Sequence, residues 1–221
     1  MIEVIYEDNH IIAVNKPAGL LVQGDKTKDQ SLIDLTKLFL KKKYNKPGNV
    51  FVGLPHRIDR PTSGAVLLSK TSKSLSRLNN LFKEKKIKKK YWVIVKKKLE
   101  KKSGSLIHYL KKNQKKNKSF VSNEKKEGFL KSELEYYFLK KLKNYFLYEI
   151  KLITGKHHQI RAQLSHLGSP IKGDIKYGSR RTNKDGSISL HAKEIKFIHP
   201  IKKEEITITA PLPKNEIWIY C

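Results

Sequence analysis

The segment 56-HRIDRPTSG-64 places one carboxylate, Asp59, between two arginines, Arg57 and Arg60. A loop carboxylate can act as a nucleophile or a charge stabiliser, and both arginines would favour its ionised form. A local ion pair or a turn-stabilising aspartate is the structural alternative, which the motif alone favours. Arginine is scarce, however, because the 48 Lys and Arg residues include six arginines. Two guanidinium groups here therefore indicate a task, such as bidentate contact with carboxylate or phosphate, that lysine does not perform.

A second cluster of chemically useful residues is 154-TGKHHQIRAQL-164, which contains Arg161. Thr154 and the backbone N–H groups at the start of a predicted helix could contact a phosphate. His157 and His158 are adjacent, so we expect their side chains to point in different directions and not to form a metal-binding pair on one face. HExxH and CxxC spacings are absent from the sequence, which therefore predicts no metal site. The structural alternative is hydrogen bonding on a helix surface.

A third candidate is Tyr91, in the strand-like run 90-KYWVIV-95. Successive side chains of a strand face opposite sides, so one of Tyr91 and Trp92 can be buried while the other faces a cleft. An aromatic ring in a strand is usually part of the core. Beside a basic cleft, however, such a ring is a natural stacking platform for an unpaired base.

The charge of the chain indicates a polyanionic partner. The 48 basic residues exceed the 20 acidic ones by 28, and the sequence pI is about 10.0. Nucleic acid is the leading candidate partner, although a coding bias towards lysine would also raise the charge everywhere. The single cysteine, Cys221, excludes an intramolecular disulfide. We recognise neither a signal peptide nor an apolar run long enough to span a membrane, so we expect a cytoplasmic protein.

The elements that must position these residues are mostly strands, several of them joined by hairpins. Strands are predicted over 2–19 with a turn at Asp8-Asn9, and over 50–54, 65–70, 90–96, 188–200 and 205–211. Helices are predicted over 31–44 with Ser31 as the cap, over 72–87, and over 157–168 with Gly168 as the C-terminal cap. Residues 132–155 are predicted to form a hairpin that turns near 143–144, and the lysine-rich stretch 97–131 to form exposed hairpins or loops. The pattern predicts an α+β fold without a clear domain linker, with the Asp59 motif in a loop between two strands.

Together, five motifs resemble those of the RluA-type pseudouridine synthases. The resemblance covers nearly the whole chain, in the expected order: NKPAGLLVQGD (15–25), HRIDRPTSG (56–64), KKYWVIV (89–95), ITGKHHQIRAQLSHLGSPIKGDIKYG (153–178) and LHAKEIKFIHP (190–200). Two positions depart from the family pattern, because Ile58 stands for leucine and Lys156 for arginine. Lys156 keeps the charge but loses the bidentate geometry of arginine.

The resemblance implies one catalytic domain over residues 1–221, with a mixed, largely antiparallel central sheet flanked by helices and loops. Because the catalytic pattern starts at residue 2, we expect no separate S4 RNA-binding domain. The implied activity is isomerisation of uridine to pseudouridine in structured RNA, either large-subunit rRNA or tRNA, by a monomer that uses neither cofactor nor metal. The implied catalytic residues are Asp59, Tyr91 and Arg161. The residues expected to contact RNA are Lys16, Arg57, Arg60, Thr62, Lys156, His157 and Gln159.

Two other functions remain open at this point. A non-catalytic RNA-binding or chaperone protein of the same fold would fit the charge and the aromatic residues, but it would not need Asp59, Tyr91 and Arg161 together. A nuclease using Asp59 with His56 or His157 would cleave the RNA chain, although the sequence lacks a convincing pair of histidines or a metal motif for that chemistry.

Overall fold

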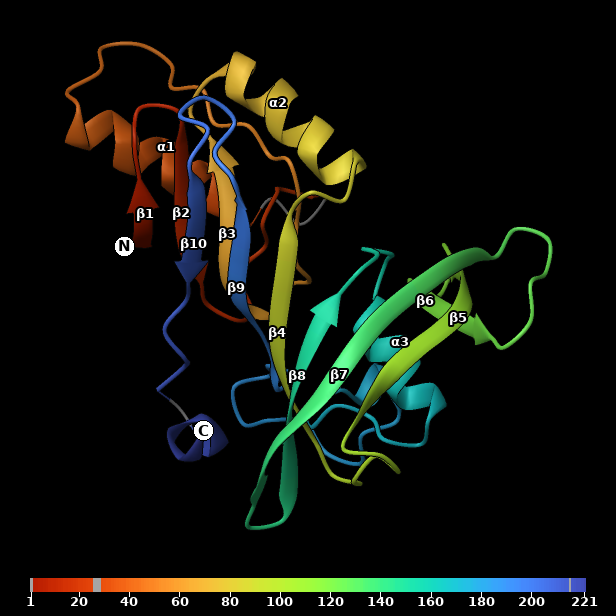
Figure 1. Ribbon diagram of the computed structural model, residues 1–221. Helices are drawn as coiled ribbons and strands as arrows, with labels where there is room; N and C mark the ends of the chain where they lie inside the picture. Colours follow the sequence, from red (N-terminus) through yellow and green to blue (C-terminus); the bar gives the residue numbers. More distant parts are fainter. Residues whose placement is uncertain (1, 26–28, 215) are drawn as a thin grey trace. The chain divides into compact units, whose positions relative to one another are not determined.

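The computed structural model describes residues 2–25, 29–214 and 216–221, and it divides the chain into two compact units. The first unit is Met1–Lys88 with Ala192–Pro213, and the second is Lys89–His191 with Lys214–Cys221. Figure 1 shows the helices and strands of both units. The expected α+β class, with mostly antiparallel strands flanked by helices, is confirmed. The expectation of one domain over 1–221 stays a prediction.

Within its described residues, the first unit contains five strands and two helices. The strands are β1 (Glu3–Glu7), β2 (Ile11–Lys16), β3 (Ser63–Ser69), β9 (Leu190–Ile198, of which the first two residues belong to the second unit) and β10 (Glu205–Thr209). They follow the order β1-β2-β3-β9, and β10 pairs with β9. The helices are α1 (Leu32–Lys43) and α2 (Ser72–Lys83), which Figure 1 shows beside these strands. The loop that carries Asp59 belongs to this unit and leads directly into β3.

The core of the first unit explains why β2 and β3 read as continuous apolar runs. All four side chains of Ile11–Val14 are fully buried, as are those of 65–68 on β3. One face of these strands packs against Leu78 of α2 and Phe197 of β9. A strand that is buried on both faces does not need polar residues at alternate positions. The two strands therefore give the end of the Asp59 loop a rigid attachment point.

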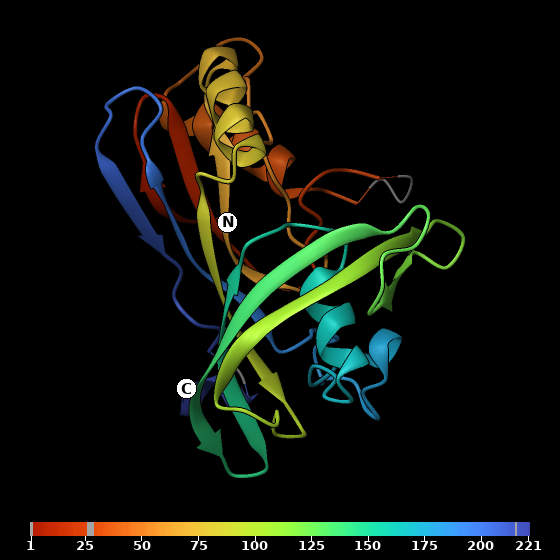
Figure 2. The same cartoon turned by 45° about the vertical axis from the view of Figure 1, so that its right-hand side comes forward.

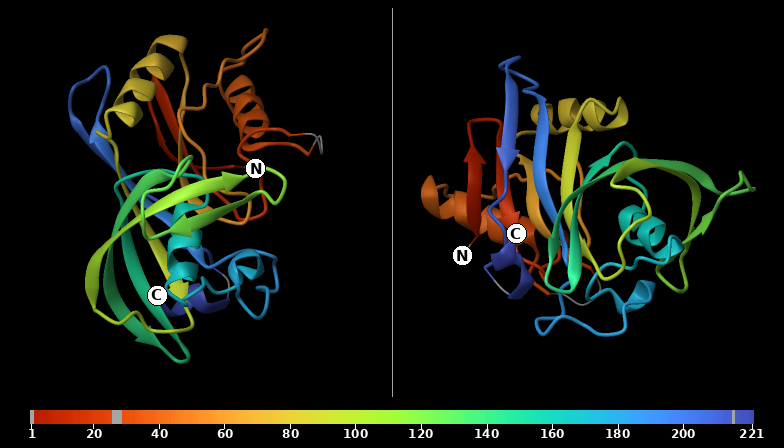
Figure 3. Two further views of the ribbon diagram at one scale, coloured as in Figure 1. Left: turned by 90° about the vertical axis from the view of Figure 1, so that its right-hand side faces the viewer. Right: turned by 60° about the horizontal axis from the view of Figure 1, so that its bottom comes forward.

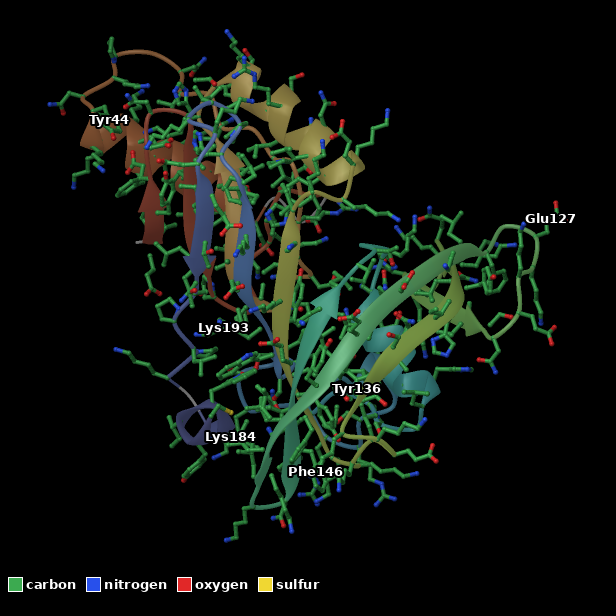
Figure 4. The ribbon with its side chains drawn as sticks, in the orientation of Figure 1. Tyr44, Glu127, Tyr136, Phe146, Lys184 and Lys193 are labelled. Carbon is green, nitrogen blue, oxygen red and sulfur yellow. The ribbon has the colours of Figure 1, made fainter. Side chains whose placement is uncertain are left out.

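The second unit is an antiparallel sheet with the order β4-β8-β7-β5-β6. Its strands are β4 (Lys88–Val95), β5 (Ser103–Asn113), β6 (Lys118–Ser122), β7 (Leu130–Leu142) and β8 (Tyr145–Leu152). Burial alternates along β5 and β7, as expected for strands with one covered face. Tyr136 of β7, labelled in Figure 4, packs edge-on against Tyr148 of β8 with 6.1 Å between ring centroids.

The helix α3 (Gln159–His166) lies inside the curve of the long strands β5 and β7 (Figures 2 and 3). The side chains of residues 159–164 are all buried, including three polar ones. Most of their polar atoms have hydrogen-bond partners, and Oε1 of Gln163 is an exception within the described residues. For example, the amide of Gln163 donates to the carbonyl oxygen of Leu106 at 3.1 Å. A short helix η1 (Ile175–Tyr177) follows α3.

Most predicted elements are present, and two predictions need correction. Residues 50–54 do not form a strand, because the only pairing there is an isolated bridge between Gly53 and Ser69. The lysine-rich stretch 97–131 contains the hairpin of β5 and β6, as one expectation allowed. It is not merely an exposed surface, however, because Leu106, His108 and Leu110 are buried.

Candidate active site

Asp59 lies in a tight turn immediately before β3. The backbone carbonyl of Asp59 accepts a hydrogen bond from the amide of Thr62 at 3.0 Å, which closes a four-residue turn. Its side chain belongs to a partly exposed residue, flanked by the exposed Arg57 and Arg60. The carboxylate therefore stands on a hydrogen-bonded turn whose far end continues into a fully buried strand.

Lys16 stabilises this turn through hydrogen bonds to backbone carbonyls. Its side chain is fully buried, and its Nζ donates to the carbonyl oxygens of Pro17, Leu20 and Arg60 at 2.9, 2.8 and 3.1 Å. Burial lowers the pKa of Lys16 to about 7, although the nearby Asp59 carboxylate acts in the opposite direction. This burial argues against the expected contact between Lys16 and RNA. Sequence reasoning missed the structural role, because nothing local in the sequence shows that the ammonium group is enclosed.

The two arginines of the motif differ in what they contact. Arg60 donates from Nε to the carbonyl oxygen of Gly19 at 2.9 Å and pairs through Nη2 with Asp29 at 2.9 Å. In return, the amide of Gly19 donates to the carbonyl of Arg60 at 2.8 Å. Arg60 thus connects the 15–25 motif to the Asp59 turn, which gives it a structural role, and its expected contact with RNA stays a prediction. Arg57 is exposed, which is compatible with the expected contact with RNA.

The end of the motif has a steric requirement for glycine. Gly64 has φ +114°, and a Cβ there would lie 2.3 Å from the carbonyl oxygen and 2.5 Å from the nitrogen of Ala192 on β9. The preceding Thr62 is 1% exposed, and its hydroxyl has no partner among the described residues. That burial is unfavourable to the expected contact between Thr62 and RNA. These residues shape the loop and join it to the sheet of the first unit.

His56 is engaged in structural contacts. Its Nε2 accepts a hydrogen bond from the amide of Leu67 at 2.9 Å, and its ring stacks on Phe82 with 4.8 Å between centroids. A nitrogen that already accepts a backbone hydrogen bond cannot act as a general base without breaking that bond. This geometry weighs against a nuclease that pairs Asp59 with Nε2 of His56.

In the second unit, Tyr91 lies on β4 and is 8% exposed, while its neighbour Trp92 is half-buried. Tyr91 faces Ile150 of β8 in the register, and Trp92 faces Glu149. The two rings therefore lie on opposite faces of the sheet, as expected. Tyr91 is the more buried of the two, so a stacking role would use the small part of the ring that is accessible.

The segment before α3 is closed by side-chain hydrogen bonds. The Oε1 of Gln159 accepts from the amide of Lys156 at 3.0 Å and from the hydroxyl of Thr154 at 2.8 Å. Gln159 also donates to the carbonyl of Glu133 at 3.1 Å and is 3% exposed. Gln159 is therefore placed to fix the loop, and its burial is unfavourable to a direct contact with RNA. Lys156 is exposed and remains a candidate contact.

The expectation that His157 and His158 point in different directions is wrong. Their rings stack with 3.7 Å between centroids. The reason is the left-handed backbone of His158, with φ 53°, which brings successive side chains to one side. His157 shares hydrogen bonds with Ser119 and Asn117 at 2.9 and 3.1 Å. Residues 2–25, 29–214 and 216–221 contain no group of three or more His, Cys, Asp or Glu side chains placed to hold a metal ion.

Arg161 lies in the first turn of α3 and forms a buried ion pair with Asp174. Tyr91 and Arg161 belong to the second unit, and Asp59 belongs to the first. Asp174 was not singled out from the sequence as a functional residue, although it stands in the resembling motif 153–178.

No helix in the described part of the chain has the length and hydropathy needed to cross a bilayer.

Comparison with known proteins gives a consistent result. The family model described as RNA pseudouridylate synthase matches residues 10–166. The "Ribosomal large subunit pseudouridine synthase C" of Buchnera aphidicola subsp. Baizongia pistaciae (strain Bp) is 35% identical over 95% of this chain and 66% of its own length. The "tRNA pseudouridine synthase C" of Vibrio vulnificus (strain CMCP6) is 32% identical over 99% of this chain and 93% of its own. The chain spans about two thirds of the length of the ribosomal relatives that it matches.

A solved structure has the same fold. "Human RNA Pseudouridylate Synthase Domain Containing 4" superimposes with a TM-score of 0.80 at 22% identity, covering 96% of this chain and 89% of the human one.

Proposed function

Because the chain belongs to the RNA pseudouridylate synthase family, whose members are isomerases that act on RNA, we propose that it converts specific uridines of structured RNA into pseudouridine. The observation that carries the proposal is the anchored turn of Asp59. This carboxylate stands on a closed turn that Lys16 and Arg60 hold in place through backbone carbonyls. A rigid mounting of this kind is what a nucleophile or charge stabiliser requires.

The chemistry of the reaction fits this set of residues. Isomerisation breaks the N1–C1′ bond of uridine and forms a C5–C1′ bond, while C5 loses a proton and N1 gains one. The reaction is redox-neutral and no group leaves, so it demands neither a cofactor nor a metal. We propose that Asp59 supplies the carboxylate, either by attack at C1′ or by a glycal-type route.

Two residues of the second unit complete the proposed mechanism. Tyr91 would stack on the target base and assist deprotonation at C5. Arg161 would pair with Asp59 and hold its charge. The target uracil must first leave its stack, which costs a few kcal/mol. The exposed Arg57 could fill the gap in the RNA or hold a flanking phosphate.

The RNA substrate follows from charge and from the relatives. The net charge of +28 supports binding to phosphates along an RNA backbone. Relatives named for large-subunit rRNA and for tRNA both match, so either RNA is a candidate. We further propose that the protein acts as a monomer in the cytoplasm, where such RNAs are modified.

The test uses RNA that carries tritium at C5 of uridine, prepared separately as large-subunit rRNA and as tRNA. We expect wild-type protein to release tritium from one of them without strand breaks. Asp59→Ala should lower the release at least about 1000-fold. The matched control is Glu127→Ala, which removes an exposed carboxylate in the loop between β6 and β7 (Figure 4) and should leave the rate unchanged.

Each other outcome has a defined meaning. Strand breaks would indicate a nuclease, and binding without tritium release from either RNA would indicate a non-catalytic RNA-binding protein. We expect Asp59→Ala to bind RNA as wild type does. A complete loss of binding would assign Asp59 a structural role instead.

A further inference from the structure

The ion pair between Arg161 and Asp174 is buried within the second unit. The side chains are 5% and 1% exposed. Arg161 donates from Nε to Oδ2 of Asp174 at 2.7 Å and from Nη2 to Oδ1 at 2.9 Å. Two parallel hydrogen bonds fix the plane of a guanidinium group, which a single contact does not achieve.

The backbone around Asp174 keeps the carboxylate in place. The carbonyl oxygen of Asp174 accepts from the amides of Tyr177 at 3.1 Å and Ser179 at 3.0 Å. The preceding Gly173 has φ +88°, and a Cβ there would lie 2.6 Å from the carbonyl oxygen of Ser187. Only glycine suits that backbone without displacing the neighbouring chain. The carboxylate is therefore mounted on a segment with little freedom to move.

Tyr177 holds the guanidinium group from a second direction. Its ring centroid lies 5.1 Å from Cζ of Arg161 and 5.0 Å from Nζ of Lys118. The hydroxyl of Tyr177 accepts a hydrogen bond from the amide of Ser119 at 2.8 Å and lies 3.1 Å from Nδ1 of His158. The ring is 3% exposed. Arg161 is thus held at its edge by a carboxylate and beside its plane by an aromatic ring.

Burying two charges is a costly way to stabilise a helix, because apolar residues of similar volume are often as stable. The geometry has a different consequence, which is a fixed direction for the remaining N–H groups of Arg161. An arginine has five such donors, and Asp174 accepts from two of them. We propose that Asp174 is a positioning residue that holds the guanidinium plane of Arg161 in the orientation that the catalytic role of Arg161 requires. This inference rests on the proposed function.

The experiment compares Asp174→Asn with wild type in three measurements. The first is the single-turnover rate of tritium release at saturating protein, and the second is the Kd for the RNA. The third is the NMR signal of the Arg161 Nε–H group, which Arg161→Lys identifies among the six arginines of the chain. We expect the rate to fall about 100-fold, the Kd to stay within about twofold, and the Nε–H signal to shift or broaden. A purely structural role would change the melting temperature without this selective loss of rate.

Two further variants keep the test decisive. The control Glu127→Gln makes the same carboxylate-to-amide change at an exposed residue of the loop between β6 and β7 and should leave all three measurements unchanged. If Asp174→Asn does not fold, Asp174→Glu replaces it, because it keeps the charge and moves the carboxylate by one methylene. The rate should still fall about tenfold or more.

A folded Asp174 variant that keeps the wild-type rate, while Arg161→Lys loses it, would overturn the positioning role and leave the proposed function intact. If wild type releases no tritium from any RNA, the proposed function fails, and the positioning role for that reaction fails with it. The Nε–H signal would still report whether Asp174 holds Arg161.

Discussion

The buried ammonium group of Lys16 makes the stability of the fold depend on pH. Burial lowers the pKa of Lys16 from 10.5 to about 7 in the folded protein, while the unfolded chain keeps the ordinary value. Between these two values the unfolded state binds more protons than the folded state. The free energy of unfolding must therefore rise with pH through that interval.

The size of the effect follows from the two pKa values. The difference, 10.5 − 7 = 3.5, corresponds to about 5 kcal/mol over the complete interval. Between pH 6 and pH 9 the folded protein releases the proton and the unfolded chain retains it. The accessible part of the linkage is then about 2.5 kcal/mol. Lys16→Met removes the titration, and it also removes the hydrogen bonds that Nζ donates to backbone carbonyls, which lowers the stability separately.

The assay is urea-induced unfolding of wild type and Lys16→Met at pH 6, 7, 8 and 9. We expect the free energy of unfolding of wild type, minus that of Lys16→Met, to increase by about 2.5 kcal/mol from pH 6 to pH 9. Lys37→Met, at an exposed position of α1, is the matched control and should follow wild type at a constant offset. Parallel curves for wild type and Lys16→Met would refute a strongly perturbed Lys16.

Two further predictions concern the Asp59 loop. Gly64→Ala should lower the free energy of unfolding by at least about 2 kcal/mol, because its Cβ would overlap the backbone of Ala192. Gly24→Ala, whose Cβ would meet nothing within 4 Å, should cost far less in the same urea titration. Arg57→Ala should weaken RNA binding and reduce the slope of log K against log salt by about 1. Filter binding between 50 and 200 mM salt measures that slope, and an unchanged slope would show that Arg57 contacts no phosphate.

Local signals in the sequence were sufficient for much of the fold. Ser31 was predicted to cap a helix, and it forms a capping box with Asp34 at the start of α1. Gly168 was predicted to end α3, and it adopts φ +70° there. The hairpin over 132–155 is also present, as β7 and β8. In each case the determinant lies within a few residues of the element that it controls.

Features that depend on distant parts of the chain were not predictable in the same way. One of the acceptors that make the burial of the Lys16 ammonium group possible is the carbonyl of Arg60, which is 44 positions away in the sequence. The stacking of His157 on His158 depends on one left-handed backbone conformation that the sequence does not signal. The core positions of β5, such as Leu106, alternate with more exposed residues, but Ile107 and Tyr109 at the more exposed positions are not polar, so the sequence does not show a period of two.

The use of arginine in place of lysine has a physical explanation at two positions of this lysine-rich chain. Arg60 uses Nε for the carbonyl of Gly19 and Nη2 for Asp29, and Arg161 uses the same two nitrogens for one carboxylate. Each position needs donors at two points of a rigid plane, and the single ammonium centre of lysine cannot span them. Lys16 shows the complementary case, because its three acceptors converge on one nitrogen. The choice of basic residue therefore follows from whether the acceptors are spread or convergent.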